Sequence, residues 1–129
     1  MTFSVYGKPQ GKARPRFRKY SKKPYTPETT VNYESAVKNA YVSAGGIYHD
    51  TAPIQIKITA YYKKAKSSKM SQPTLKPDVD NVAKIICDGL NGVAYKDDKQ
   101  VTRLKVDKVW AEDGIERVEI EVDELIYTR

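Results

Sequence analysis

The chain has 129 residues, of which 40% are hydrophobic, and it carries a formal net charge of +7. This length suits one domain with its own core, and the apolar stretches are too short to cross a bilayer. The single cysteine and single histidine exclude an internal disulfide, a zinc site built from four such ligands, and nucleases that depend on several histidines. The first residues lack the features of a signal peptide, so we expect a cytoplasmic protein that does not bind a membrane.

The charge is distributed unevenly along the chain. Residues 1–76 contain 15 Lys and Arg but only 3 Asp and Glu, whereas residues 77–129 contain 8 and 13. A basic half suits a polyanion such as nucleic acid, and an acidic half with clustered aspartates suits divalent cations. A solvated surface without a partner would also account for such charges, so the asymmetry by itself favours nucleic acid only weakly.

The chain begins with a short strand and a basic loop. Residues 1–6 alternate in hydrophobicity, which predicts a strand. Residues 7–27 contain four prolines, two glycines and eight basic residues, which predict an extended loop without a regular element. We call residues 7–27 the arm.

A helix and a strand follow the arm. Thr26 is expected to cap the helix and Pro27 to occupy its first turn, and the glycines at 45–46 are expected to end it. Isoleucines on alternate positions between residues 53 and 62 predict a strand with one buried face. The basic and polar residues 63–77 predict a mobile loop.

The second half of the chain predicts a helix and two strands. Residues 78–90 carry apolar side chains at helical spacing, and an Asn-Gly pair ends that helix. Residues 101–110 and 115–122 predict two strands that form a hairpin. The order strand, helix, strand, helix, strand, strand predicts a single α+β domain, with a mixed β-sheet and two helices packed on it.

Acidic residues gather around the second helix. Asp78 falls at or near its N-cap, and Asp80 lies on the side opposite its apolar face. Asp98 lies in the turn after the helix, and a strand that runs back along the helix would bring it towards Asp78 and Asp80. Carboxylates held close together repel one another unless a cation neutralises them, and hard divalent cations bind oxygen ligands. These residues therefore predict a metal site suited to phosphodiester hydrolysis.

The same residues also have an ordinary structural interpretation. Aspartate is a preferred N-cap, and the pairs Asp80–Lys84 and Lys84–Asp88 are i,i+4 ion pairs worth only about 0.3–0.5 kcal/mol each. Lys84 is either a surface partner of these carboxylates or a cation that stabilises the charge of a transition state. The helix alone does not decide between the two.

The arm has the composition of a nucleic-acid contact. Basic side chains neutralise phosphates, and the aromatic rings of Phe17, Tyr20 and Tyr25 between them can stack on bases. A solvated loop is the alternative, and it applies equally to the lysines of residues 63–69. The residues that we expect to contact DNA are Lys8, Lys12, Arg14, Arg16, Arg18 and Lys76.

Four blocks of sequence carry a resemblance to a known family. They are Gly7–Phe17, Lys76–Asn81 with Lys84 after it, Asp88–Gly92 and Tyr95–Val101. With these blocks, in this order, the chain resembles the RusA-type Holliday junction resolvases. The order of the blocks is specific, whereas the Asp-x-Asp motif alone would be weak.

The resemblance implies catalytic residues and an activity. It implies metal-binding aspartates at Asp78, Asp80 and Asp98 and an essential lysine at Lys84, with Asp97 as a supporting carboxylate or an alternative to Asp98. It also implies a homodimer that makes paired nicks in a four-way DNA junction during recombination and repair. The implied cofactor is Mg²⁺, with Mn²⁺ as a substitute.

Two other functions are compatible with the residues. One is a non-catalytic nucleic-acid-binding module, in which the aspartates are only caps and surface charge. The other is a less selective structure-specific nuclease that uses the same site. Metal-dependent cleavage distinguishes a nuclease from the module, and a preference for junctions over duplexes and flaps distinguishes the two nucleases.

Overall fold

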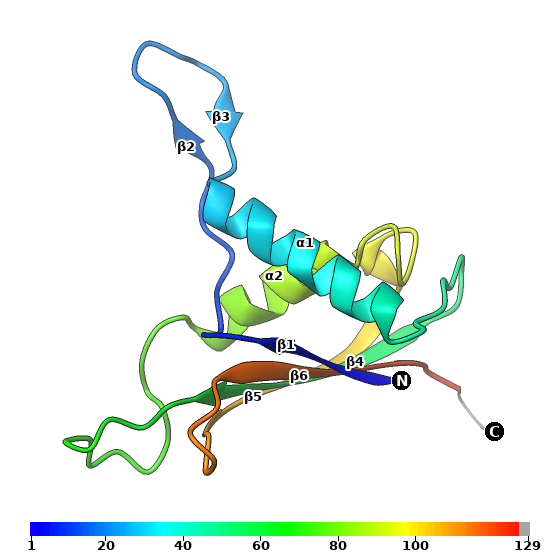
Figure 1. Ribbon diagram of the computed structural model, residues 1–129. Helices are drawn as coiled ribbons and strands as arrows, with labels where there is room; N and C mark the ends of the chain where they lie inside the picture. Colours follow the sequence, from blue (N-terminus) through cyan, green and yellow to red (C-terminus); the bar gives the residue numbers. More distant parts are fainter. Residues whose placement is uncertain (127–129) are drawn as a thin grey trace.

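The centre of the fold is a mixed four-stranded sheet with both helices on one face, as the computed structural model of residues 1–126 shows (Figure 1). The strands lie in the order β1-β6-β4-β5, where β1 is Thr2–Tyr6, β6 is Arg117–Glu124, β4 is Ile54–Tyr62 and β5 is Val101–Trp110. β4 pairs with β5 in parallel, and the other pairs are antiparallel. The predicted α+β class is therefore confirmed. Neither helix in this part of the chain has the length and hydrophobicity needed to cross a membrane.

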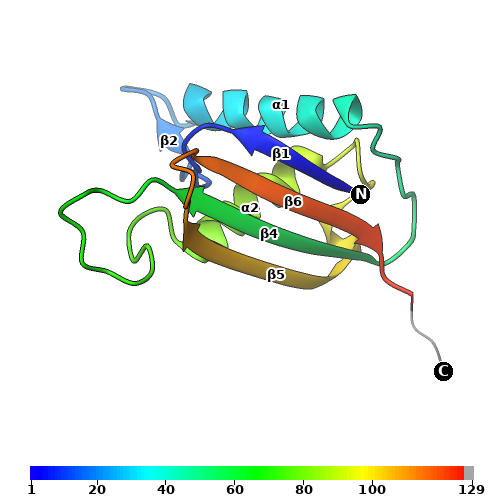
Figure 2. The same ribbon diagram turned by 60° about the horizontal axis from the view of Figure 1, so that its bottom comes forward.

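The two faces of the sheet differ because side chains alternate along each strand. Ile54, Ile56 and Ile58 of β4 point towards the helices and are almost fully buried. Gln55 and Lys57 lie between them on the opposite face, which the helices leave open (Figure 2). The alternating isoleucines therefore predicted both this strand and its buried face correctly, and their burial is a main source of hydrophobic stabilisation.

The two helices pack against each other as well as against the sheet. They are α1 (Glu28–Ser43) and α2 (Val79–Leu90). At Gly89 a Cβ atom would lie 2.9 Å from the Cβ of Val37, so the close approach of the helices requires glycine there. The Nζ of Lys38 on α1 donates to the carbonyl oxygens of Gly89 and Asn91 at 2.7 and 2.8 Å. A cation thus binds carbonyls that the end of α2 leaves free, which fixes α2 at its C-terminal end.

The helix ends are close to those predicted. Pro27, with an extended ψ of 143°, is the N-cap of α1, so Thr26 is not the cap and Pro27 lies just outside the first turn. Gly45 has a φ of 82°, a conformation that ends a helix and that glycine adopts easily. Asp78 is the N-cap of α2 as predicted, although its side chain makes no capping hydrogen bond.

The prediction that the last two strands form a hairpin is wrong. Ile58 of β4 pairs with Val106 of β5 on one side and with Ile120 of β6 on the other, so β4 lies between them. β4 is the most apolar strand, and a central position covers both of its edges. β6 also begins at Arg117, two residues later than predicted. β5 and β6 are consecutive in the sequence, and for this reason they were predicted to pair. They do not pair, because the apolar strand β4 is buried between them.

The arm contains a small hairpin that was not predicted. Its strands, β2 (Arg16–Phe17) and β3 (Pro24–Tyr25), pair antiparallel. Figure 1 shows this hairpin projecting beyond the N-terminal end of α1. Two residues per strand are too few to give an alternating pattern, so the sequence indicated only an irregular segment.

Candidate active site

A groove of about 440 Å³ lies between α2 and the start of β5. Asp80 and Lys84 line it from α2, and Asp98 lines it from the turn before β5. Ala83, Cys87 and residues 101–104 form the rest of its wall. This groove brings together two of the three predicted metal ligands and the predicted catalytic lysine.

The helical period places Asp80 and Lys84 in the groove. The two residues lie four apart and therefore on the same side of α2, while Val82 and Ile86 are fully buried on the other side. The Nζ of Lys84 lies 3.3 Å from Oδ1 of Asp88, and the side chain remains 57% exposed. The ammonium of Lys84 is thus oriented by a partner but still open to a ligand in the groove.

A capped turn fixes the position of Asp98. Asp98 begins the short 3-10 helix η1 (Asp98–Gln100), and the carboxylate of Asp97 caps this helix by accepting a hydrogen bond from the backbone N–H of Lys99 at 2.9 Å. The side chain of Gln100 accepts a hydrogen bond from the backbone of Asp97 at 3.2 Å and donates one to the carbonyl of His49 at 2.9 Å. Asp97 is used by the cap, and Asp98 lines the groove.

The two neighbouring aspartates differ in their electrostatics. Partial burial raises the pKa of Asp98, and the carboxylate of Asp97 raises it further, whereas Lys84 acts in the opposite direction. The hydrogen bond from Lys99 lowers the pKa of Asp97. The cap also uses the carboxylate of Asp97, whereas the carboxylate of Asp98 lines the groove. Asp98 is therefore the better placed of the two to bind a cation.

Asp78 lies beside the groove and does not line it. Its side chain is exposed and borders two shallow hollows, one with Lys76 and Asn81 and one with Lys108. Across residues 1–126, no three acidic, histidine or cysteine side chains lie close enough to form a ready metal cage. The structure thus brings Asp80 and Asp98 to one groove and places Asp78 at the start of the same helix, outside that groove.

The donors around the groove nevertheless fit a hard divalent cation. Mg²⁺ keeps several waters and is usually bound by one or two carboxylates together with substrate phosphates. Asp80 and Asp98 supply two such carboxylates, and the carboxylate of Asp78 is free of any capping bond. Burial raises the pKa of the Cys87 thiol to about 11, so this residue stays protonated at neutral pH and offers no thiolate to a softer metal.

Comparisons with known proteins identify the family. The family described as "Endodeoxyribonuclease RusA" matches residues 6–123. This chain belongs to the RusA family. "Uncharacterized protein YqaN" of Bacillus subtilis (strain 168) is 34% identical over 140 aligned positions, which cover 95% of each chain. The RusA match includes the arm, α2 and the turn that carries Asp98, so the resemblance seen in the motifs is confirmed.

An ion-pair network connects the arm of this RusA-family chain to the groove. The Nζ of Lys12 lies 3.0 Å from Oε2 of Glu34 on α1 and 3.1 Å from Oδ2 of Asp88 on α2. Asp88 also binds Lys84, so one carboxylate joins the arm to the predicted catalytic lysine. Burial lowers the pKa of Lys12, but its hydrogen bonds to Glu34 and Asp88 outweigh this effect and raise the pKa.

Sequence reasoning missed the part that Glu34 and Asp88 play in this network. Lys12 was predicted to contact DNA, and the structure places its ammonium on two carboxylates instead of in solvent. Asp88 was noticed as an i,i+4 partner of Lys84 and as part of the block Asp88–Gly92, but not as a partner of Lys12. No local pattern reveals the other interactions, because they join residues that are far apart in the sequence.

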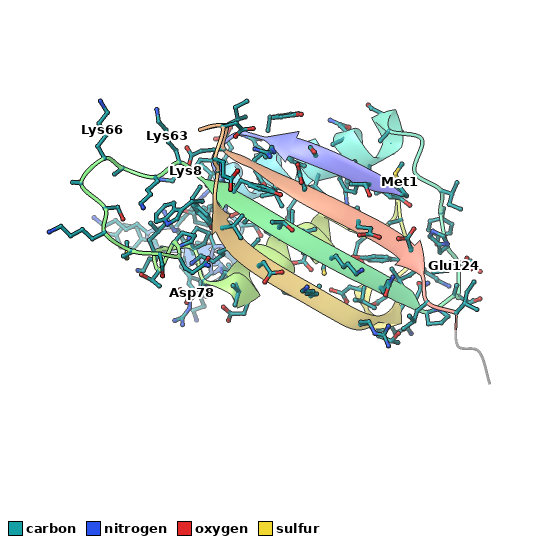
Figure 3. The ribbon with its side chains drawn as sticks, turned by 90° about the horizontal axis from the view of Figure 1, so that it is seen from below. Met1, Lys8, Lys63, Lys66, Asp78 and Glu124 are labelled. Carbon is teal, nitrogen blue, oxygen red and sulfur yellow. The ribbon has the colours of Figure 1, made fainter. Side chains whose placement is uncertain are left out.

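The remaining predicted DNA contacts are exposed side chains. They are Lys8, Arg14, Arg16, Arg18 and Lys76. Figure 3 shows Lys8 at the same end of the sheet as Lys63, Lys66 and Asp78, with Met1 and Glu124 at the opposite end. Exposed basic residues and the start of α2 therefore share one end of this RusA-family fold.

Proposed function

We propose that this chain is a Mg²⁺-dependent endodeoxyribonuclease, with Mn²⁺ as a substitute, that resolves four-way DNA junctions in recombination and repair. The observation that carries the proposal is the groove of a RusA-family chain in which Asp80, Asp98 and Lys84 converge. The exposed basic arm, which is attached beside the start of α2, supports DNA as the substrate.

The groove suggests a division of roles among its residues. Asp80 and Asp98, with Asp78 beside them, would hold the metal, which when bound polarises a phosphoryl oxygen and lowers the pKa of water. Lys84 donates a hydrogen bond to a non-bridging oxygen of the scissile phosphate and stabilises the negative charge that develops there. Asp88 orients Lys84 for this interaction.

The arm and the loop before α2 would bind the phosphate backbone. Arg14, Arg16 and Arg18 are exposed on or next to the hairpin. Lys76 precedes the N-cap of α2 by two residues, and Lys8 lies at the end of the sheet where Asp78 lies (Figure 3). Lys12 was also expected to contact DNA, but it would reach a phosphate only by leaving its two carboxylates. In this proposal Lys12 anchors the arm, and its exposed neighbours bind the phosphates.

A cleavage assay on defined DNA substrates tests the proposal. We expect cleavage of a four-way junction in Mg²⁺ or Mn²⁺, little cleavage of linear duplex or flap, and none in EDTA. Asp80→Asn serves as the inactive control. Equal cleavage of all three substrates would identify a less selective nuclease. Binding without cleavage under every metal condition would identify a non-catalytic module and refute the proposal.

We also propose that the active unit is a homodimer. A four-way junction has two-fold symmetry, and its resolution needs two nicks in opposed strands. One chain supplies one groove, so a symmetric pair matches the substrate, and C2 dimers are the commonest oligomers. Sedimentation would give the mass, and a supercoiled cruciform plasmid should be linearised in one binding event. A monomer that still produced paired cuts would refute the dimer.

A further inference from the structure

The tip of the arm's hairpin presents an aromatic side chain to solvent. Tyr20 is 94% exposed and has a φ of 66°. A tyrosine in this left-handed region of backbone space is unusual and costs energy. A backbone hydrogen bond nevertheless closes the turn, because the N–H of Ser21 donates to the carbonyl oxygen of Arg18 at 3.0 Å. The fold thus holds a large, partly apolar side chain away from its own core.

Tyr20 and Tyr25, two aromatic residues of the arm, differ in how far their rings are covered by other side chains. The ring of Tyr25 is covered by the guanidinium of Arg18 at 4.9 Å and is half-buried. The ring of Tyr20 is approached by the ammonium of Lys19 at 5.2 Å, yet almost all of it remains accessible. Tyr25 therefore stabilises the hairpin, whereas Tyr20 contributes almost nothing to packing within the chain.

The base of the arm is fixed on α2. A Cβ at Gly11 would lie 2.6 Å from the Cβ of Pro77 and 3.0 Å from that of Asn81, so the arm approaches the start of α2 as closely as glycine allows. The backbone N–H of Lys12 donates to the carbonyl oxygen of Asn81 at 3.0 Å. Together with the two ion pairs of Lys12, these interactions set where the arm leaves the body, next to Asp78.

The distance from this anchor to the tip is limited by chain length. Tyr20 follows Gly11 by nine positions, which span at most roughly 30 Å. This is less than one turn of duplex DNA, which is about 34 Å. The tip therefore lies within about one helical turn of the start of α2, the helix that carries Asp78 and Asp80.

The charge around the tip identifies the kind of partner. Residues 7–27 contain eight basic residues and no acidic residue, so the hairpin attracts a polyanion. Phosphates bind the basic side chains. An exposed aromatic ring adds binding energy only where the face of a base is accessible for stacking. Bases in a continuous duplex are already stacked, whereas bases at the branch point of a junction lose a neighbour.

We propose that Tyr20 stacks on a base at the branch point of a four-way junction. Because the arm is fixed beside Asp78, this stacking sets which phosphate lies in the groove, and Tyr20 is a positioning residue for junction selectivity. This proposal rests on the proposed function, since it names the part of that substrate that the hairpin recognises.

The test measures binding of the full-length protein to DNA in EDTA, so that it does not depend on cleavage. The junction carries the fluorescent base 2-aminopurine either at the branch point or far along one arm. We expect the wild-type protein to change the fluorescence of the branch-point probe and not that of the distant probe. Tyr20→Ala should abolish the change and weaken junction binding roughly 5- to 150-fold, the range for removal of one base–aromatic stack, with duplex binding nearly unchanged.

Two further variants separate stacking from other effects. Tyr20→Phe keeps the ring and should retain both the fluorescence change and the affinity. Tyr48→Ala removes a half-exposed tyrosine from the loop at the other end of α1 (Figure 1), and it should behave like the wild type. The same fluorescence change in wild type and Tyr20→Ala, or no change in either, would overturn the proposal.

Two other outcomes are distinguishable from these. If Tyr20→Ala alters the sedimentation of the free protein but not its junction affinity, the tip contacts a second copy of the chain and the proposal is wrong. Failure of the wild type to cleave junctions in Mg²⁺ would refute the proposed function, while the metal-free fluorescence result would still decide the role of Tyr20.

Discussion

The groove and the hairpin of the arm differ in how their charged residues are held. In the groove, Lys84 is bound by Asp88, and a capped turn fixes Asp98. In the hairpin, Arg16 and Arg18 are exposed, and the arm has no acidic residue to bind them. Charges fixed in advance suit the stabilisation of a transition state, whereas exposed charges suit binding along a polyanion. We therefore expect groove substitutions to change rates and arm substitutions to change affinities.

The largest effect is expected from the aspartates. Asp78→Asn, Asp80→Asn and Asp98→Asn should each reduce cleavage by roughly 10³-fold or more, because removal of a metal ligand takes away several kcal/mol of transition-state stabilisation. Junction binding and the melting temperature should change little, since none of these side chains is part of the core and Asp78, the N-cap of α2, makes no capping hydrogen bond to lose. Gel shifts, thermal melts and single-turnover cleavage measure the three quantities. Near-native cleavage by Asp78→Asn or Asp80→Asn would contradict the assigned site.

The next largest effect is expected at Lys84. Lys84→Ala should lower the single-turnover rate by roughly 10²- to 10³-fold, as expected when one hydrogen bond to developing charge is removed, with unchanged junction affinity. Asp88 keeps Lys12 as a partner, so the fold should be retained. Lys105→Ala is the matched control, because Lys105 is an exposed lysine whose nearest carboxylate is 3.9 Å away. Equal rates for the two variants would make Lys84 a structural residue.

Substitutions in the arm should have the opposite effect: they should weaken DNA binding and leave the cleavage rate unchanged. Replacing Arg14, Arg16 and Arg18 by alanine should weaken DNA binding and reduce the slope of log affinity against log salt by about 0.9 for each duplex phosphate that the protein no longer neutralises. The cleavage rate at saturating enzyme should stay near that of the wild type. The comparison variant replaces Lys63, Lys64 and Lys66. If that variant alone flattens the salt dependence, the loop and not the arm binds the backbone.

The smallest effect concerns the residue that joins the two regions. Lys12→Met should lower the free energy of unfolding by about 1.5–3 kcal/mol, the usual range for hydrogen bonds to charged groups. The pKa of Lys12 is raised above its usual 10.5, so its stabilising effect is complete at neutral pH and is lost only as the pH rises past that value. Denaturant titrations of wild type, Lys12→Met and the exposed control Lys8→Met measure it. Equal stability of all three at pH 7 would show that the network contributes nothing.

Local patterns in the sequence predicted the elements but not their long-range interactions. Helical spacing correctly placed Asp80 and Lys84 on the outward side of α2. The helix–turn–strand order predicted that Asp98 approaches Asp78 and Asp80, and Asp98 does share the groove with Asp80, whereas Asp78 lies outside it. The position of β4 between β5 and β6, and the ion pairs of Lys12 with Glu34 and Asp88, were not predictable. The strand order depends on which of several distant strands is buried most favourably at the centre of the sheet. The ion pairs depend on which distant carboxylates the fold brings to Lys12. Local patterns in a single sequence contain neither piece of information.

The central position of β4 has a consequence for synthesis of the chain. Both neighbours of Ile58 in the sheet, Val106 and Ile120, come from much later in the sequence. Pairing of distant segments is slow compared with local pairing, and chains emerge from the ribosome N-terminus first. The basic arm is therefore translated well before β5, which completes the groove. A nascent chain can expose its basic arm early, but it cannot form the groove until most of the protein has been made.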